Sequence, residues 1–190
     1  MFIYKNKYFL MIESIKDIDL KNIKKQNKFS IIYRNKKKLE NTTDLLNFRR
    51  FCKIKSIKFY VANNTKLAVL LNSDGLYLSA FNKSLRSLLL KKSNFKIIGS
   101  AHSLKEISLK SKQGCEVILF SKLFLVSYDK KASFLGVIRF NNYLKIFKNL
   151  IPLGGISINN LNSLNNVNCQ GFALMSEVKK KPAKIFSRLL

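Results

Sequence analysis

The sequence has few of the features that mark disulfide-stabilised, zinc-binding or membrane-spanning proteins. Its three cysteines, Cys52, Cys115 and Cys169, lie far apart and form no Cys-x-x-Cys pair, so neither a disulfide framework nor a zinc site is expected. No apolar run approaches the roughly 18 residues that a membrane helix needs, and the N-terminal segment lacks a signal-peptide cleavage site. We therefore expect a cytoplasmic protein with no membrane partner.

Acidic residues are also scarce, at 10 Asp and Glu against 36 Lys and Arg, which gives a formal net charge of +26. Such a balance is typical of nucleic-acid-binding proteins. Here, however, the lysines are spread along the whole chain, and no RNA-binding aromatic signature, zinc finger or basic dimeric helix accompanies them. Specific nucleic-acid binding is therefore the least favoured function class. We expect the positive charge to attract small phosphorylated substrates instead.

Eight apolar runs of strand length alternate with helical segments along the 190 residues. The runs cover residues 8–12, 29–33, 58–62, 76–78, 95–98, 116–120, 150–153 and 171–175. This alternation predicts a parallel sheet, and eight units closing on themselves predict a single (β/α)8 TIM barrel that occupies residues 1–190 as one domain. A doubly wound sheet would need a glycine-rich first turn, and the first turn, residues 13–16, contains no glycine.

Several helix boundaries can also be predicted from capping residues. Thr42 or Thr43 is expected to begin a helix that runs to Ile54, and Ser103 a helix that ends near Gly114. Helices are also expected after Asp17, over 67–71, 85–90 and 137–147, after a cap at Ser157 or Asn159, and from Pro182.

The residues just after the predicted strands are cationic or neutral hydrogen-bond donors, with almost no carboxylate among them. They are Arg34, Lys36, Asn63, Asn64, Asn82, Ser100, His102, Lys130, Gly154, Gly155 and Ser176. In a barrel these strand ends share one face, and this set suits binding of phosphate or pyrophosphate better than carboxylate acid–base chemistry.

The pair Gly154-Gly155 is the clearest candidate for a phosphate site. Glycines allow the backbone to pass close to a ligand, and the following helix would direct free N–H groups at the same place. An ordinary turn without a ligand is an equal alternative. His102 is expected to be a structural hydrogen-bonding residue, and Asp74 to fix a turn before a strand.

Taken together, these strand ends resemble the thiamine phosphate synthase/TenI family over about residues 8–178. Six motifs occur in the family's order, at near-family spacing. They are Ile32-Tyr-Arg-Asn-Lys36, Ala62-Asn-Asn64, Ser73-Asp-Gly-Leu-Tyr-Leu78, Ser100-Ala-His-Ser103, Leu153-Gly-Gly-Ile156 and Gly171-Phe-Ala-Leu-Met-Ser176.

The resemblance implies a transferase that joins an aminopyrimidine diphosphate to a thiazole phosphate with release of pyrophosphate. It implies that the pyrophosphate is bound by Arg34, Lys36, Asn63, Ser100 and Lys130. It implies that the thiazole phosphate is bound by Gly154, Gly155 and Ser176. No residue is assigned as an acid–base catalyst, and whether the chain self-associates as a homo-oligomer is left open.

The chain departs from the family pattern at three positions. Ile32 occupies the position of the pyrimidine-reading glutamine, and Asn64 and Asn82 replace the two aspartates that bind Mg²⁺. Mg²⁺ is thus the implied cofactor, with both charged ligands lost. Two interpretations remain: a diverged synthase in thiamine biosynthesis, or an inactive or repurposed barrel that binds a thiamine precursor or another phosphorylated small molecule.

Overall fold

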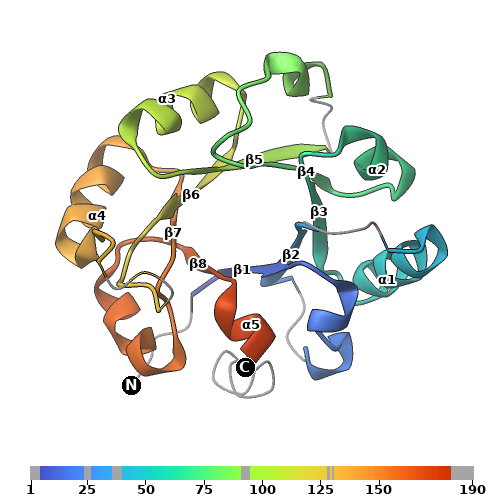
Figure 1. Ribbon diagram of the computed structural model, residues 1–190, viewed down its shortest axis with the longest axis horizontal. Coiled ribbons are helices and arrows are strands. Elements are labelled where there is room, and N and C mark those ends of the chain that lie inside the picture. The colour runs from blue at the N-terminus through green and yellow to red at the C-terminus, as the bar shows by residue number, and fades with distance from the viewer. Residues whose placement is uncertain are drawn as a thin grey trace.

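The computed structural model of the protein describes residues 5–23, 27–35, 40–90, 95–127, 129 and 131–180. Within these ranges eight parallel strands form a ring, and helices surround it on the outside (Figure 1). The strands are β1 (Lys7–Ile12), β2 (Phe29–Tyr33), β3 (Lys58–Ala62), β4 (Gly75–Leu78), β5 (Lys96–Ala101), β6 (Val117–Ser121), β7 (Leu150–Leu153) and β8 (Gly171–Leu174). The predicted (β/α)8 TIM barrel is confirmed.

The connections between strands contain both α-helices and shorter 3₁₀ helices. The α-helices are α1 (Thr42–Ile54), α2 (Thr65–Leu70), α3 (Leu104–Lys112), α4 (Gly136–Ile146) and α5 (Ser176–Lys180). The 3₁₀ helices are η1 (Ile15–Asp17), η2 (Leu20–Asn22), η3 (Leu85–Leu90) and η4 (Ile158–Asn166). None of the helices in the described ranges combines the length and apolar character that a membrane crossing requires.

The ring is hydrogen-bonded in the order β7-β6-β5-β4-β3-β2-β1-β8, and every neighbouring pair is parallel. Among the described residues the ladders stop at β7 and β8, which lie next to each other at a seam (Figure 1). The carbonyls of Asn149 and Leu153 accept hydrogen bonds from the β6 side, from Ile118 and Leu123. Because backbone groups alternate sides along a strand, residue 152 faces β8, and it is proline, which has no N–H to donate.

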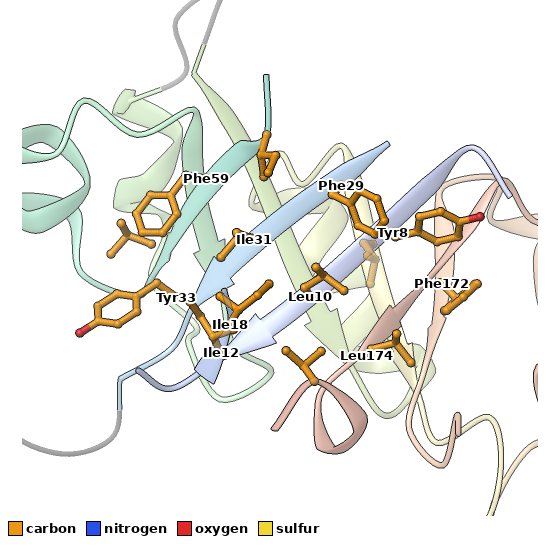
Figure 2. Packing of buried hydrophobic residues seen from close by; sticks show 14 of the residues in the cluster. Tyr8, Leu10, Ile12, Ile18, Phe29, Ile31, Tyr33, Phe59, Phe172 and Leu174 are labelled. Carbon is orange, nitrogen blue, oxygen red and sulfur yellow. The ribbon is translucent and has the colours of Figure 1, made fainter. Parts of the chain in front are cut away.

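Side chains of each strand alternate between two apolar layers. Phe9 and Met11 point into the barrel, where they pack with residues such as Tyr60 and Tyr77. The other set, which includes Tyr8 and Leu10 of β1, packs outward against neighbouring strands and the helices; Figure 2 shows these two side chains beside Phe29 of β2 and Phe172 of β8. Burial of both strand faces explains why the strands read as continuous rather than alternating apolar runs.

Several predicted helix boundaries were wrong in detail. Asn41, not Thr42 or Thr43, caps α1, because its side chain accepts the Thr43 N–H at 3.1 Å. The segment after Asp17 is non-helical until the single turn of η2, and η3 and η4 are also 3₁₀ rather than α-helical. Asparagine and serine side chains offer local backbone bonds that compete with an α-helix.

Of three further predictions, one helix cap is confirmed, one strand is longer than predicted, and one helix lies outside the described residues. Ser103 caps α3 as expected, and its hydroxyl accepts the Glu106 N–H at 3.3 Å. The fifth strand extends to Ala101, so Ser100 lies inside it rather than beyond its end. The helix expected from Pro182 lies outside the described residues.

Asp74 does more than fix a turn at the N-terminal end of the barrel. Its Oδ2 accepts the Phe59 N–H of β3 at 2.7 Å and lies 3.1 Å from the guanidinium of the buried Arg49 of α1. Gly75 follows, and a Cβ there would lie 1.9 Å from the Lys96 carbonyl oxygen of β5. Such contacts at the N-terminal end of a TIM barrel serve stability, which leaves the opposite end for chemistry.

Candidate functional site

A cavity of about 450 Å³ opens at the C-terminal ends of the strands, beside the seam of the ring. Its polar lining comes from Arg34, His102, Ser121, Lys122, Ser127, Ser157, Asn160, Ser176 and Glu177. Its apolar lining comes from Leu125, Val126, Leu153, Ile156, Ala173 and Met175, and Gly154 and Gly155 complete it. The lining thus combines hydrogen-bond donors and cations with apolar side chains that suit an apolar ring.

The structure brings four of the predicted site residues together in this cavity: Arg34, Gly154, Gly155 and Ser176. Gly154 and Gly155 have φ values of 91° and 70°, which side-chain-bearing residues rarely adopt. A Cβ on Gly155 would lie 2.3 Å from the Phe124 carbonyl oxygen in the β6–α4 loop. The second glycine is therefore required by close packing as well as by its backbone conformation.

The turn after β7 is held by the short helix that follows it. Asn160 of η4 donates its amide to the Gly155 carbonyl at 2.7 Å, and its Oδ1 accepts the Ser157 N–H at 2.8 Å. Ser157 precedes η4 as one of the two caps predicted for this helix. The Gly-Gly turn therefore has a fixed shape, although the helix behind it is 3₁₀ rather than α.

His102 and Ser121 form a pair in the cavity that sequence reasoning did not assign. The His102 Nδ1 lies 2.7 Å from the Ser121 Oγ, and Ser121, at the end of β6, is buried. The backbone N–H of His102 donates to the Glu106 carboxylate at 2.6 Å, which fixes the start of α3. His102 is thus a hydrogen-bonding residue, as expected. Ser121 could have been found in the sequence from its position directly after the predicted strand 116–120.

A second polar group covers the C-terminal ends of β3, β4 and β5. Asn63 accepts the Ser79 N–H and the Asn82 amide, both at 3.1 Å, and donates its own amide to the Ser79 hydroxyl at 3.1 Å. Ser100 accepts the Tyr77 hydroxyl at 2.8 Å. Burial raises the pKa of Tyr77, so this phenol stays protonated and donates.

The residues predicted to bind pyrophosphate do not all lie in one place, because some line the cavity and others belong to the polar group over β3–β5. Arg34 lines the cavity, whereas Asn63 and Ser100 belong to the group over β3–β5 and lie outside the cavity lining. Lys36 and Lys130 lie outside the described residues. Ile32 is fully buried in the inner layer of the barrel, where it offers no polar group to a pyrimidine.

Asn64 and Asn82 already use their amide oxygens. The Asn64 Oδ1 accepts the Leu67 N–H at 3.0 Å as the cap of α2, and the Asn82 Oδ1 accepts the Ser84 N–H at 3.0 Å. Within the part of the chain that the structure describes, no group of three or more His, Cys, Asp or Glu side chains could hold a metal ion. Mg²⁺ prefers carboxylates and phosphates, so this neutral, already bonded pair does not fit the implied Mg²⁺.

A buried lysine lies beneath Asn82. The Lys110 Nζ donates to the Asn82 carbonyl at 2.7 Å and to the Gln113 Oε1 at 2.9 Å, and both Lys110 and Gln113 are fully buried. Gln113 donates to the same Asn82 carbonyl at 3.0 Å and to the Ser84 carbonyl at 2.9 Å. Burial lowers the pKa of Lys110, and the nearby Cys115 and Glu106 oppose that shift.

Comparison with known proteins identifies relatives of this arrangement. A profile of the thiamine monophosphate synthase family matches residues 19–178. The thiamine-phosphate synthase of Clostridioides difficile (strain 630) is 24% identical over 139 residues, which cover 71% of this chain and 65% of the relative. The matched part therefore spans slightly less than two thirds of that relative's own length.

Solved structures show the same fold. A thiamine phosphate pyrophosphorylase from Pyrococcus furiosus has a TM-score of 0.74 at 17% identity, with 98% of each chain covered. TrpF from Jonesia denitrificans has a TM-score of 0.56 at 11% identity, with 97% of this chain and 99% of that chain covered. Because the family profile matches most of its length, the chain belongs to the thiamine monophosphate synthase family.

Proposed function

We propose that this chain is a diverged thiamine phosphate synthase, a transferase that joins an aminopyrimidine diphosphate to a thiazole phosphate. The observation that carries the proposal is the cavity at the C-terminal end of the barrel. There Arg34, the Gly154-Gly155 turn and Ser176 come together from three separate strand ends, in a cavity that apolar side chains also line. Membership of the family supports a place in thiamine biosynthesis.

In the proposed reaction the carbon–oxygen bond between the pyrimidine methylene and its diphosphate breaks first. The oxygen keeps the electron pair and leaves as pyrophosphate, and the lone pair of the thiazole nitrogen then forms the new carbon–nitrogen bond. Negative charge grows on the leaving group, so catalysis needs fixed donors and cations more than a general base. Few carboxylates at the strand ends would then be an advantage.

The residues divide between the two substrates in this proposal. Gly154, Gly155 and Ser176 hold the thiazole phosphate in the cavity, with Arg34 at its edge facing the diphosphate. Asn63 and Ser100 supply neutral donors to the diphosphate, together with Lys36 and Lys130. The Tyr77 hydroxyl, 2.8 Å from the Ser100 Oγ, orients that hydroxyl from inside the barrel.

A second candidate function is a repurposed barrel that binds a phosphorylated small molecule without the transfer reaction. The buried Ile32 favours it, because a pyrimidine would find no amide at this position. The amide oxygens of Asn64 and Asn82, occupied by backbone N–H groups, favour it as well. In this case the cavity would still bind a phosphate monoester.

The test is formation of thiamine monophosphate from the two precursors by the purified protein, with binding of thiazole phosphate measured separately by calorimetry. We expect slow product formation in the wild type and a loss of roughly a hundredfold in Arg34→Met, the scale of one fixed cation at a developing charge. Ser176→Ala should weaken thiazole phosphate binding instead. Binding without any product would favour the repurposed barrel, and absence of both would refute the synthase proposal.

A further inference from the structure

Lys110 is unusual because its fully buried ammonium donates, within the part of the chain that the structure describes, only to neutral hydrogen-bond acceptors. Its Nζ bonds the Asn82 carbonyl oxygen and the Gln113 side-chain oxygen. The nearest acidic group on its own helix, Glu106, instead accepts the backbone N–H of His102. Buried lysines are rare unless paired with a carboxylate, so a positive charge left in this way needs an explanation.

The hydrogen bonds lead from Lys110 directly to the rim of the barrel. Lys110 and Gln113 together bond the Asn82 carbonyl, and the Asn82 amide then donates to the Asn63 Oδ1 at 3.1 Å. Asn63 is also bonded twice to Ser79, so the β4–η3 loop, α3 and the end of β3 form one connected network. The Lys110 ammonium is therefore connected, through the backbone carbonyl of Asn82, to the amide groups at the strand ends.

The same location is where Asn64 and Asn82 fail to provide a metal site. Asn82, whose side chain brings no charge, receives through its backbone a hydrogen bond from a buried cation. A buried charge is screened by salt and water much less than a surface lysine, so it acts on an anion above it over several ångströms.

We propose that Lys110 replaces a divalent cation at this rim, by positioning Asn82 and by supplying positive charge next to the amide network. The inference rests on the proposed function, since pyrophosphate is the anion this charge would attract. Lys110 is a positioning residue here and does not touch the ligand. The chain would then bind free pyrophosphate by protein charges alone.

The first experiment needs no variant: titration of the wild type with pyrophosphate at low salt, once with EDTA and once with excess Mg²⁺. We expect binding in EDTA that stays equal or weakens with Mg²⁺, because the metal neutralises charge that the fixed cations recognise. A rise in affinity of roughly tenfold or more with Mg²⁺ would overturn the inference about Lys110 alone. Absence of pyrophosphate binding in both conditions would refute this inference and also weaken the proposed function.

The second experiment compares Lys110→Met with Lys112→Met, which removes an exposed lysine from the same helix. We expect Lys110→Met to weaken pyrophosphate binding in EDTA by roughly tenfold or more and Lys112→Met to change it by less than about threefold. Thiazole phosphate binding in the cavity should be unchanged in both. Gln113→Leu, which loosens the loop but keeps the charge, should have the smaller effect of the two buried variants. Equal pyrophosphate binding by wild type and Lys110→Met would overturn the proposal.

Discussion

At the scale of single residues, the turn after β7 needs a backbone conformation that only glycine adopts easily. Gly155 combines a φ of 70° with a carbonyl oxygen 2.3 Å from the position of a Cβ. Gly136, at the start of α4, has the same φ of 70° but nothing within 4 Å of a Cβ. Substitutions at Gly155 and Gly136 can therefore distinguish the free-energy cost of the backbone conformation from the free-energy cost of close packing.

We expect Gly155→Ala to lower the free energy of unfolding by about 3 kcal/mol or more, because the β6–α4 loop must move away from the new methyl group. Gly136→Ala should cost only about 1 kcal/mol, the penalty of a positive φ alone. Denaturant unfolding of both variants measures the difference. Equal losses would mean that the loop yields without strain. Thiazole phosphate binding should be lost only in Gly155→Ala.

At the scale of the elements, capping decides where helices begin, and here the sequence was ambiguous. Three polar residues in a row, Asn41, Thr42 and Thr43, can each cap a helix. The structure selects Asn41, whose Oδ1 accepts the Thr43 N–H.

Replacement of Asn41 by alanine should therefore destabilise the protein by about 1 kcal/mol, because one N–H at the start of α1 loses its partner. Thr43→Ala is the matched control and should change the free energy of unfolding by less than about 0.5 kcal/mol, since alanine has the higher helix propensity. Thermal or urea unfolding is the measurement. A larger loss in Thr43→Ala than in Asn41→Ala would contradict the assignment of the cap.

Strands were easier to predict than helices for a physical reason. Each barrel strand is buried on both faces, so runs such as residues 29–33 and 58–62 are apolar except at Ser30 and Lys58, and both were predicted with the bounds that the structure shows. Segments such as η4 are rich in asparagine, and whether such a turn becomes α or 3₁₀ depends on side-chain bonds such as that from Asn160 to Gly155.

The candidate site was predictable to the extent that it follows from strand ends. Arg34, Gly154, Gly155 and Ser176 end strands, and the structure brings them into one cavity. Lys110 lies in the last turn of α3 and Gln113 caps the end of that helix, where such side chains usually face solvent, so no sequence pattern indicated their burial. Ser121 was not assigned, although it follows a predicted strand, because nothing in the sequence pairs it with His102.

At the scale of the whole molecule, the buried thiols link stability to pH. Burial raises the pKa of Cys52 and of Cys115 from 9.0 to about 12. Below pH 9 both states keep these protons, so the thiols add no pH dependence. Between about pH 9 and 12 the unfolded chain loses protons that the folded chain retains, so stability falls as pH rises.

We therefore expect the free energy of unfolding to decrease through this alkaline range, by up to about 1.4 kcal/mol per pH unit for each thiol. The double variant Cys52→Ala, Cys115→Ala should show a shallower decrease, because only other groups, such as the buried tyrosines, still respond. Urea unfolding across a pH series measures both slopes. Identical slopes in the two proteins would show that these thiols do not control the alkaline limit.

At the seam between β7 and β8 the described strands are not joined by a hydrogen-bonded ladder, so backbone bonds do not close the barrel there. Gly154 and Gly155 follow β7 on one side of this seam, and Ser176 follows β8 on the other side. Side chains such as Leu153, Ala173 and Met175 pack between the two strands. Side-chain packing, unlike a ladder of backbone hydrogen bonds, adjusts in small steps. The β7 and β8 sides of the proposed phosphate site can therefore change their spacing while every other strand pair keeps its register.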